Sequence, residues 1–336
     1  MQLTIPARLK LGDTIGFVSP SAGVAGLVPH RITQAVKMLE ELGYKVKIAE
    51  HAMQNAGYVS ASVEERVRDI HAMFLDPAVK MIMCTIGGNN GNQLLRHLDY
   101  DLIRNHPKIF TGYSDITVLH YAIASQSGLA TYYGPCAMTQ FGEYTRILEY
   151  TLEHFSRELD SALPETGYDV PASATWTNEM MDWFQKLDRT RPRALLPNAG
   201  YEWLAPGEAE GETLGGAILS VNHLSGTPYW LDPKESIFFL DILKTSELNE
   251  GAVDAFLTDL QNMGVFDVIR GLMISRPADY TAEETERLKG QILRCVGNKK
   301  YPILFNANMG HTDPIMTLRY GRRIRLDSRR NALTVL

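Results

Sequence analysis

Three polar residues have neighbours typical of a nucleophilic hydrolase site. The first is Ser114, in Gly-Tyr-Ser-Asp between the apolar run "KIFTGY" and the helix-like run "DITVLHYAIASQSG". A serine on such a strand-to-helix turn projects its hydroxyl above the sheet edge, where the helix N-terminus faces developing negative charge. The usual hydrolase elbow has a glycine where this chain has Ile116, so a helix-capping role for Ser114 or Asp115 stays open.

The second and third residues are a histidine and an acid that follow apolar runs. His311 comes after Gly310 in "ANMGHTDP", in a loop bounded by proline, which suits an exposed general base. Asp241 closes "SIFFLD", where a buried carboxylate needs a partner, and it is the candidate that orients the imidazole. A helix or turn cap is the alternative for Asp241. Other histidines fall in helical or apolar turn stretches: His71, His97, His120, His154 and His223.

A glycine pair offers backbone N–H groups near the nucleophile. Gly87 and Gly88 in "TIGGNNG" follow a predicted buried strand, where backbone without side chains can approach an oxyanion or a phosphate. An ordinary strand-to-helix turn is the alternative. The stretch lacks the GxGxxG spacing of a dinucleotide site, and the absence of a following Gly-Lys-Ser/Thr excludes a P-loop.

The elements that position these residues alternate along the first part of the chain. We expect strands within 14–20, 79–88 and 108–113, and helices over 63–77, 92–106 and 115–128. Apolar strands between helices are typical of a parallel sheet covered on both faces. Ligands of such sheets bind at the carboxyl ends of the strands, where the glycine pair and Ser114 fall.

We therefore predict an α/β fold with two domains. Residues 1–142 form an N-terminal parallel-sheet α/β domain that carries the serine. Residues 143–199 form a helix over 143–156 and then a connector or lid that contains tryptophan. Residues 200–336 form a C-terminal β-rich α/β domain that carries the acid and the histidine.

Composition limits the classes of function. The chain has 336 residues, 45% of them hydrophobic and 21% charged, and no apolar tract of membrane-spanning length. The first residues lack the pattern of a secretory signal, so we expect a cytoplasmic protein with no membrane partner. A net charge of −6 without a long basic run argues against nucleic acid polymers as partners. The three cysteines lack metal or disulfide spacing and are interpreted as buried thiols.

Five motifs together resemble peptidase family S66: "FTGYSDITVL", "YYGP", "GTPY", the acid that closes "IFFLD", and "GHTDP". The family comprises murein LD-carboxypeptidases and microcin C immunity proteins. The resemblance implies a two-domain fold, a Ser-Glu-His triad, usually a homodimer, and no metal or organic cofactor. It assigns Ser114 as the nucleophile and His311 as the base, with the N–H groups of Gly88 and Asp115 as the oxyanion hole.

The stretches "GGNNGNQLL", "TWTNEMMDW" and "GHTDPIMTL" look more like the immunity branch than the murein branch. The resemblance then implies a small peptide or aminoacyl-nucleotide conjugate as substrate, with Asn89 among the substrate-binding residues. Trp176 or Trp183 would stack on the nucleobase; packing of the lid is the alternative for both. Hydrolysis of murein tetrapeptides is the second candidate activity, and binding of a conjugate without cleavage is the third.

Two positions depart from the family pattern. The family acid is normally Glu, whereas this chain has Asp241, which is shorter by one methylene. Either the histidine moves closer, or Glu247 supplies the carboxylate, or the triad is impaired. Ala217 stands where the family often has Asn after a glycine pair, so substrate contacts there are expected to differ.

Overall fold

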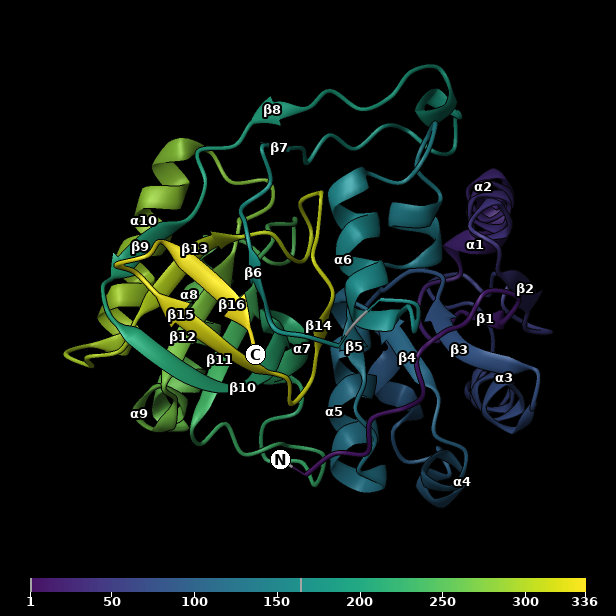
Figure 1. Ribbon diagram of the computed structural model, residues 1–336, viewed down its shortest axis with the longest axis horizontal. Helices are drawn as coiled ribbons and strands as arrows, with labels where there is room; N and C mark the ends of the chain where they lie inside the picture. The colour runs from purple at the N-terminus through teal and green to yellow at the C-terminus, as the bar shows by residue number, and fades with distance from the viewer. Residues whose placement is uncertain (1, 164) are drawn as a thin grey trace.

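The computed structural model describes residues 2–163 and 165–336, which are organised around two sheets (Figure 1). The first sheet has six strands in the order β14-β5-β4-β3-β1-β2, and only the β14–β5 pair is antiparallel. This confirms the parallel sheet predicted for the first part of the chain. Its strands are β1 (Thr14–Val18), β2 (Lys45–Ile48), β3 (Val79–Cys84), β4 (Ile109–Gly112), β5 (Tyr132–Tyr133) and β14 (Leu318–Arg319).

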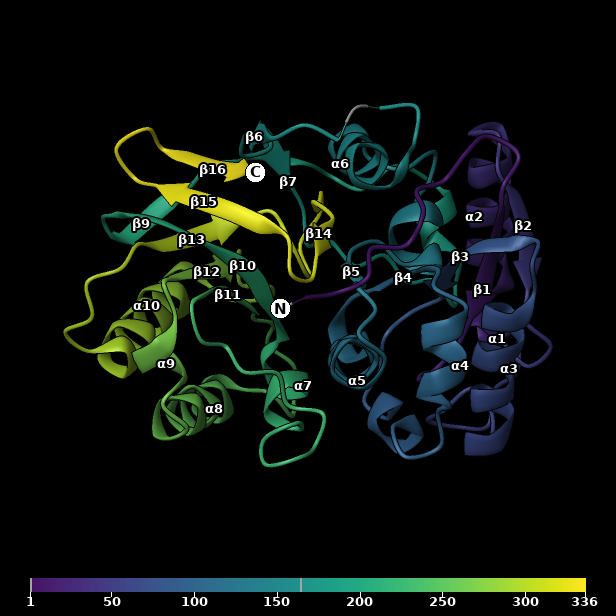
Figure 2. The same cartoon turned by 60° about the horizontal axis from the view of Figure 1, so that its bottom comes forward.

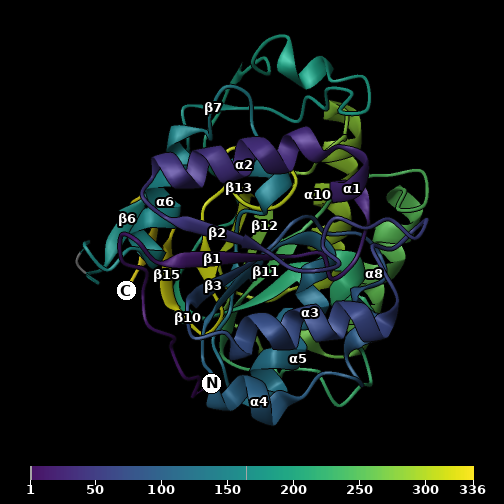
Figure 3. The same ribbon diagram turned by 90° about the vertical axis from the view of Figure 1, so that its right-hand side faces the viewer.

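Helices cover both faces of this sheet, with α2 on one face of β1 to β3 and α3 on the other (Figure 3). Local sequence explains their ends: Ser62 and Glu65 form a capping box at the start of α3, and Gly128 ends α5 with φ 72°. The helical elements are α1 (Val24–Leu27), α2 (Pro29–Glu41), α3 (Val63–Leu75), α4 (Tyr100–Asn105), α5 (Thr117–Ser127), the 3₁₀ turns η1 (Gly91–Leu94) and η2 (Ser114–Ile116), and the π turn η3 (Ala137–Phe141).

Two predicted helices were too long. Residues 92–106 form η1 and then α4 in place of one helix, because the Asp99 side chain accepts a hydrogen bond from Leu102 N and starts a new helix there. The helix predicted over 143–156 begins only at α6 (Glu149–Leu159). Glu143, at the predicted start of that helix, is buried and paired with Arg193 and does not lie on an exposed helix face.

The second sheet has eight strands in the order β6-β16-β15-β10-β11-β12-β13-β9. Its centre, from β10 to β13, is parallel, and α8, α9 and α10 lie on one face (Figure 2). Its elements are β6 (Tyr168–Val170), β9 (Glu202–Ala205), β10 (Glu208–Ala217), α7 (Ile218–Asn222), β11 (Ser236–Asp241), α8 (Glu250–Asn262), α9 (Val265–Val268), β12 (Gly271–Ser275), α10 (Ala282–Val296), β13 (Ile303–Ala307), β15 (Arg323–Asp327) and β16 (Ala332–Val335).

Residues 171–200, which we call the lid segment, connect β6 to β9. The two ends of the segment pair as β7 (Thr175–Trp176) and β8 (Leu196–Pro197), and its tip carries the 3₁₀ turn η4 (Leu187–Arg189). Figure 1 shows the segment reaching from the side of the second sheet across to the side of the first. The segment therefore spans both halves of the molecule.

The two sheets meet at the start of α5. Thr117 Oγ1 donates a hydrogen bond to Ser114 O at 2.7 Å and accepts one from Ala217 N at 3.1 Å. Because Ala217 is the last residue of β10, the turn that carries the serine is held by both halves of the molecule. Ala217 thus contacts the base of the serine turn through its backbone.

Two further observations concern buried thiols and membranes. Cys84, Cys136 and Cys295 are buried and unpaired, which confirms their interpretation as buried thiols.

Across the described residues, no helix combines the length and the apolar character needed to cross a membrane.

Candidate active site

Ser114 lies on a sharp turn between β4 and α5. Its backbone has φ 65°, in the left-handed region that residues with a side chain rarely adopt. Neither η2 nor α5 has a side-chain cap, so the structure does not support the capping alternative. The hydroxyl oxygen instead lies 3.0 Å from His311 Nε2. A strained turn that aims a serine at a histidine has the geometry of a nucleophile elbow.

His311 and Asp241 extend this contact into a chain of hydrogen bonds. His311 Nδ1 lies 2.8 Å from Asp241 Oδ2, so Nδ1–H donates to the carboxylate and Nε2 accepts from the Ser114 hydroxyl. Asp241 ends β11 and is fully buried, whereas Glu247 is exposed in the following loop. The structure thus brings together the serine, the histidine and the aspartate that the sequence suggested.

A close backbone approach lets the shorter acid reach the imidazole. Gly310 has φ 81°, and a Cβ on it would lie 2.0 Å from Asp241 Oδ1. No other residue type fits there without displacing the carboxylate. The loop that carries His311 therefore lies directly against the acid. Of the three alternatives that the Glu-to-Asp departure raised, this geometry favours the first, in which the histidine lies closer to the acid.

Tyr133 joins the same site, although sequence reasoning did not select it. Its hydroxyl donates to Asp241 Oδ2 at 2.5 Å and accepts from Ser114 N at 3.4 Å. Burial raises the pKa of Tyr133 well above its usual value, and the Asp241 charge raises it further, so the phenol stays protonated and donates. The "YYGP" motif at β5 could have indicated Tyr133, but a tyrosine in an apolar strand is equally typical of a buried core residue.

The loop with the glycine pair packs against the serine turn. A Cβ on Gly87 would lie 2.8 Å from Ser114 Cβ and 3.3 Å from Asp115 N. Gly88 has φ 150° and has no room for a side chain, because its Cβ would lie 2.4 Å from Ser21 Oγ. The Asp115 carboxylate accepts from Ser21 Oγ at 2.6 Å and from Gly91 N at 2.7 Å. These bonds fix the loop beside the nucleophile, where backbone N–H groups can stabilise an oxyanion.

A cavity of about 330 Å³ is lined by Ser114, His311 and Gly88. This volume suits a small-molecule ligand. Asn89 and Trp183, which the resemblance implied as substrate-binding residues, also line the cavity, whereas Trp176 is not part of the lining. The structure therefore separates the two tryptophans that the sequence left equivalent.

Each of these tryptophans lies on an arginine. The guanidinium carbon of Arg31 is 4.4 Å from the Trp183 ring centroid, and that of Arg276 is 4.9 Å from the Trp176 ring centroid. Trp183 thus packs the lid segment against α2 and also lines the cavity. Both of its predicted roles, packing of the lid and stacking on a nucleobase, therefore stay open. The position of Trp176 favours lid packing alone.

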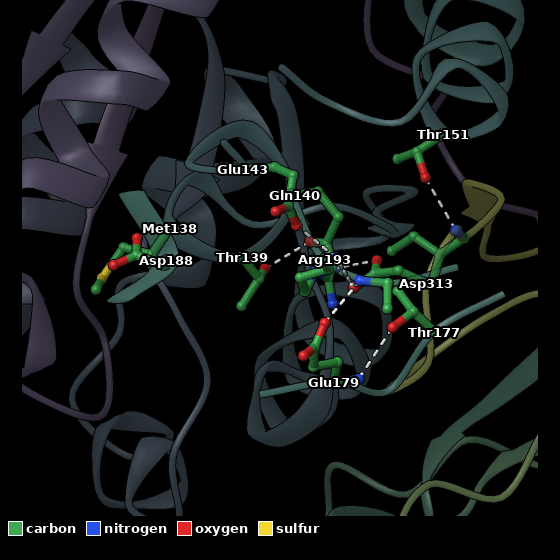
Figure 4. A network of polar contacts seen from close by, with 12 residues as sticks. Met138, Thr139, Gln140, Glu143, Thr151, Thr177, Glu179, Asp188, Arg193 and Asp313 are labelled. Carbon is green, nitrogen blue, oxygen red and sulfur yellow. Dashed lines mark hydrogen bonds and ion pairs between the residues drawn. The ribbon is translucent and has the colours of Figure 1, made fainter. Parts of the chain in front are cut away.

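Charged side chains are part of the cavity lining, and Figure 4 shows the polar contacts that several of them make. Arg193 Nη2 of the lid segment lies 2.5 Å from Glu143 Oε2 and 2.8 Å from Asp313 Oδ2. Burial lowers the pKa of Arg193, but the charges and hydrogen bonds of Asp313 and Glu143 outweigh it and raise the pKa above its usual value. Arg193 is therefore a permanent cation between two carboxylates.

Family models match both halves of the chain: the LD-carboxypeptidase N-terminal domain over residues 15–134 and the LD-carboxypeptidase C-terminal domain over residues 210–326. YocD of Bacillus subtilis, which is named as a carboxypeptidase, is 36% identical over 96% of this chain and 95% of its own length. The chain therefore belongs to the S66 peptidases and is a serine peptidase.

Solved structures share the fold over nearly the whole chain. An MccF-like protein from Bacillus anthracis is 35% identical with a TM-score of 0.88, and the match covers 99% of each chain. The microcin C7 self-immunity protein MccF in complex with aspartyl sulfamoyl adenosine is 27% identical with a TM-score of 0.91, covering 99% of this chain and 98% of the other. These matches agree with the two-domain α/β fold predicted from the sequence.

Proposed function

We propose that this serine peptidase hydrolyses an amide-type bond in aminoacyl-nucleotide conjugates. Ser114 is the nucleophile, His311 is the general base, and Asp241 orients the imidazole. The observation that carries the proposal is the continuous chain of hydrogen bonds from Ser114 Oγ through His311 to Asp241, which starts at the wall of the cavity.

The reaction uses these groups in turn. Ser114 Oγ attacks the scissile carbonyl carbon while His311 Nε2 takes the hydroxyl proton, and Asp241 stabilises the imidazolium. The oxyanion accepts hydrogen bonds from the backbone N–H groups of Gly88 and Asp115. When the tetrahedral intermediate collapses, His311 gives its proton to the leaving nitrogen. Water then hydrolyses the acyl-enzyme through the same base.

Three observations support a nucleotide conjugate as the substrate. A relative that matches nearly the whole chain binds aspartyl sulfamoyl adenosine. The cavity of this chain is lined by the indole of Trp183, and an aromatic surface that stacks on a base contributes about 1–3 kcal/mol elsewhere. Asn89 lines the same cavity and offers amide donors and an acceptor to the polar part of the ligand.

The test is mass spectrometry of the purified protein after incubation with aspartyl sulfamoyl adenosine and, separately, with a murein tetrapeptide. We expect wild type to release the amino acid from the conjugate and Ser114→Ala to release none. Cleavage of the tetrapeptide alone would favour the LD-carboxypeptidase alternative. Binding of the conjugate by wild type without cleavage would favour the non-catalytic alternative.

The homodimer implied by the resemblance and the cytoplasmic location stay predictions. Size-exclusion chromatography with light scattering measures the first, and a monomer mass at micromolar concentration would contradict it.

A further inference from the structure

Arg193 links the lid segment to both halves of the molecule. It reaches Glu143, which lies after η3 in the first half, and Asp313, which lies in the loop between β13 and β14. Its side chain is only 14% exposed, and its two partners are 6% and 11% exposed. Figure 4 shows Arg193 between these carboxylates, with Gln140 and Thr177 near them. The ion pair is therefore an interior contact and not a surface one.

Asp313 is also tied to the lid segment through its backbone. Asp313 N donates to Thr177 O at 2.9 Å, and Thr177 N donates to Asp313 O at 2.7 Å. Gln140 Nε2 donates to Asp313 Oδ1 at 3.0 Å. The lid segment thus holds Asp313 at two points, and Gln140 holds it at a third.

Asp313 is two residues from His311, in the same short loop. His311 has no hydrogen bond of its own to the lid segment: its ring nitrogens contact Asp241 and Ser114. The loop must nevertheless keep the imidazole within 3.0 Å of the hydroxyl. A displacement of about 1 Å at a reacting group reduces rates by as much as about 100-fold. Whatever fixes Asp313 therefore bears on the alignment of the base.

Removing the guanidinium would leave two buried carboxylates facing each other. Burial raises the pKa of Glu143, and the neighbouring charge of Asp313 raises it further, while Arg193 and Arg31 lower it. Without Arg193, like-charge repulsion and the desolvation of both acids would push the Asp313 loop away from Glu143.

We infer that Arg193 is a positioning residue that couples the lid segment to the alignment of His311 through Asp313. The inference rests on the proposed function, because it concerns the base of that reaction. It predicts that loss of Arg193 slows attack by Ser114 even on a probe too small to touch the lid segment.

The test measures the rate at which a small alkyl fluorophosphonate labels Ser114 in the full chain. In this reaction the Ser114 oxygen bonds to phosphorus, fluoride leaves, and the hydroxyl proton passes to His311. We expect Arg193→Met to slow labelling by between about 10-fold and 100-fold and to alter its pH profile. Arg193→Lys, which keeps the charge, should recover part of the rate.

Arg191→Met is the matched control, because Arg191 is also in the lid segment but pairs with Glu179 and not with Asp313. It should label at the wild-type rate. If Arg193→Met fails to fold, as judged by its circular dichroism, Asp313→Asn carries the same expectation.

The outcomes separate the inference from the proposed function. No labelling of wild type would overturn the proposed function. Labelling of wild type with an equal rate in the folded variant would overturn only the role of Arg193. An equal slowing in Arg191→Met would also overturn it, because the effect would then belong to the lid segment as a whole.

Discussion

The reaction centre and the lid segment are held in place by different kinds of contact. In the reaction centre, Ser114, Tyr133 and Asp241 lie at or just after the ends of buried strands, and hydrogen bonds join them through the Tyr133 hydroxyl. The lid segment has only two strands of two residues each. Apart from a few hydrogen bonds, such as those between Thr177 and Asp313, it is attached to its surroundings by ion pairs and by arginine–tryptophan contacts. Strand ends are rigid supports, whereas ion pairs depend on both partners being present.

This difference predicts which substitutions should affect all substrates and which should affect only some. A change in the reaction centre alters groups that act on any scissile carbonyl, so it should affect all substrates alike. A change at a cavity-lining residue of the lid segment that does not hold the His311 loop, such as Trp183, should matter only for substrates that reach it. Substitutions at four residues, two of them with a matched control, test this division.

The largest effect is expected from Ser114→Ala, which removes the nucleophile and leaves the cavity. We expect kcat to fall by about 10⁴ to 10⁶ on every substrate that wild type cleaves, with binding of aspartyl sulfamoyl adenosine retained. Steady-state kinetics and calorimetry measure the two quantities. Turnover near the wild-type rate would remove Ser114 from the reaction.

Asp241→Asn should come next, with a loss of about 10³ to 10⁴ in kcat, because the amide cannot stabilise the imidazolium and favours the wrong tautomer. Asp241→Glu should also lower activity, because Gly310 already touches the shorter carboxylate and leaves no space for another methylene. Glu247→Gln is the control, at an exposed site, and should have no effect. A large loss of kcat in Glu247→Gln, with no loss in Asp241→Asn, would assign the role of orienting His311 to Glu247 and not to Asp241.

Trp183→Ala should weaken binding of the nucleotide conjugate by about 1–3 kcal/mol and leave the labelling of Ser114 by a small fluorophosphonate nearly unchanged. Trp176→Ala, the matched control, should have little effect on conjugate binding, because Trp176 does not line the cavity. Calorimetric titration compares the two variants. Equal losses of affinity in both variants would assign both tryptophans to packing of the lid segment and would contradict base recognition by Trp183.

The smallest effect is expected from Tyr133→Phe, which removes one of the two donors to Asp241 Oδ2. A hydrogen bond to a charged group contributes about 1.5–3 kcal/mol, and the remaining donor retains part of this, so we expect kcat to fall by about 10-fold. The loss should be the same for a nucleotide conjugate and for a small ester. A substrate-dependent loss would place Tyr133 in recognition and not in the reaction centre.

The parts of this site that were predictable share one property. Ser114 and Asp241 follow apolar runs, and His311 follows a strand-like run. The carboxyl ends of parallel strands gather at one edge of a sheet, so polar residues there stand out in the sequence. The alternation of strands and helices in the first half was also predictable, because the spacing of apolar residues within each element can be read from the local sequence.

The ion pairs of the lid segment were not predictable in this way. Arg193 lies in a stretch without clear periodicity, and its partners Glu143 and Asp313 are 50 and 120 residues away along the chain. The local sequence does not distinguish Arg193 from Arg191, because both arginines have acidic partners only in the folded chain. The break between η1 and α4 was missed because a single cap at Asp99 outweighed a helical apolar pattern.

The strand β14 has a consequence for shortened forms of the protein. Leu318 and Arg319 pair with Tyr133 and Tyr132 and so close one side of the first sheet, although they lie far along the chain. A fragment that ends near residue 200 would leave β5 with unpaired N–H and C=O groups, which can join another chain. A premature stop anywhere before residue 318 therefore yields a product that we expect to aggregate, and the two halves cannot be separated into independent parts by a cut in the lid segment.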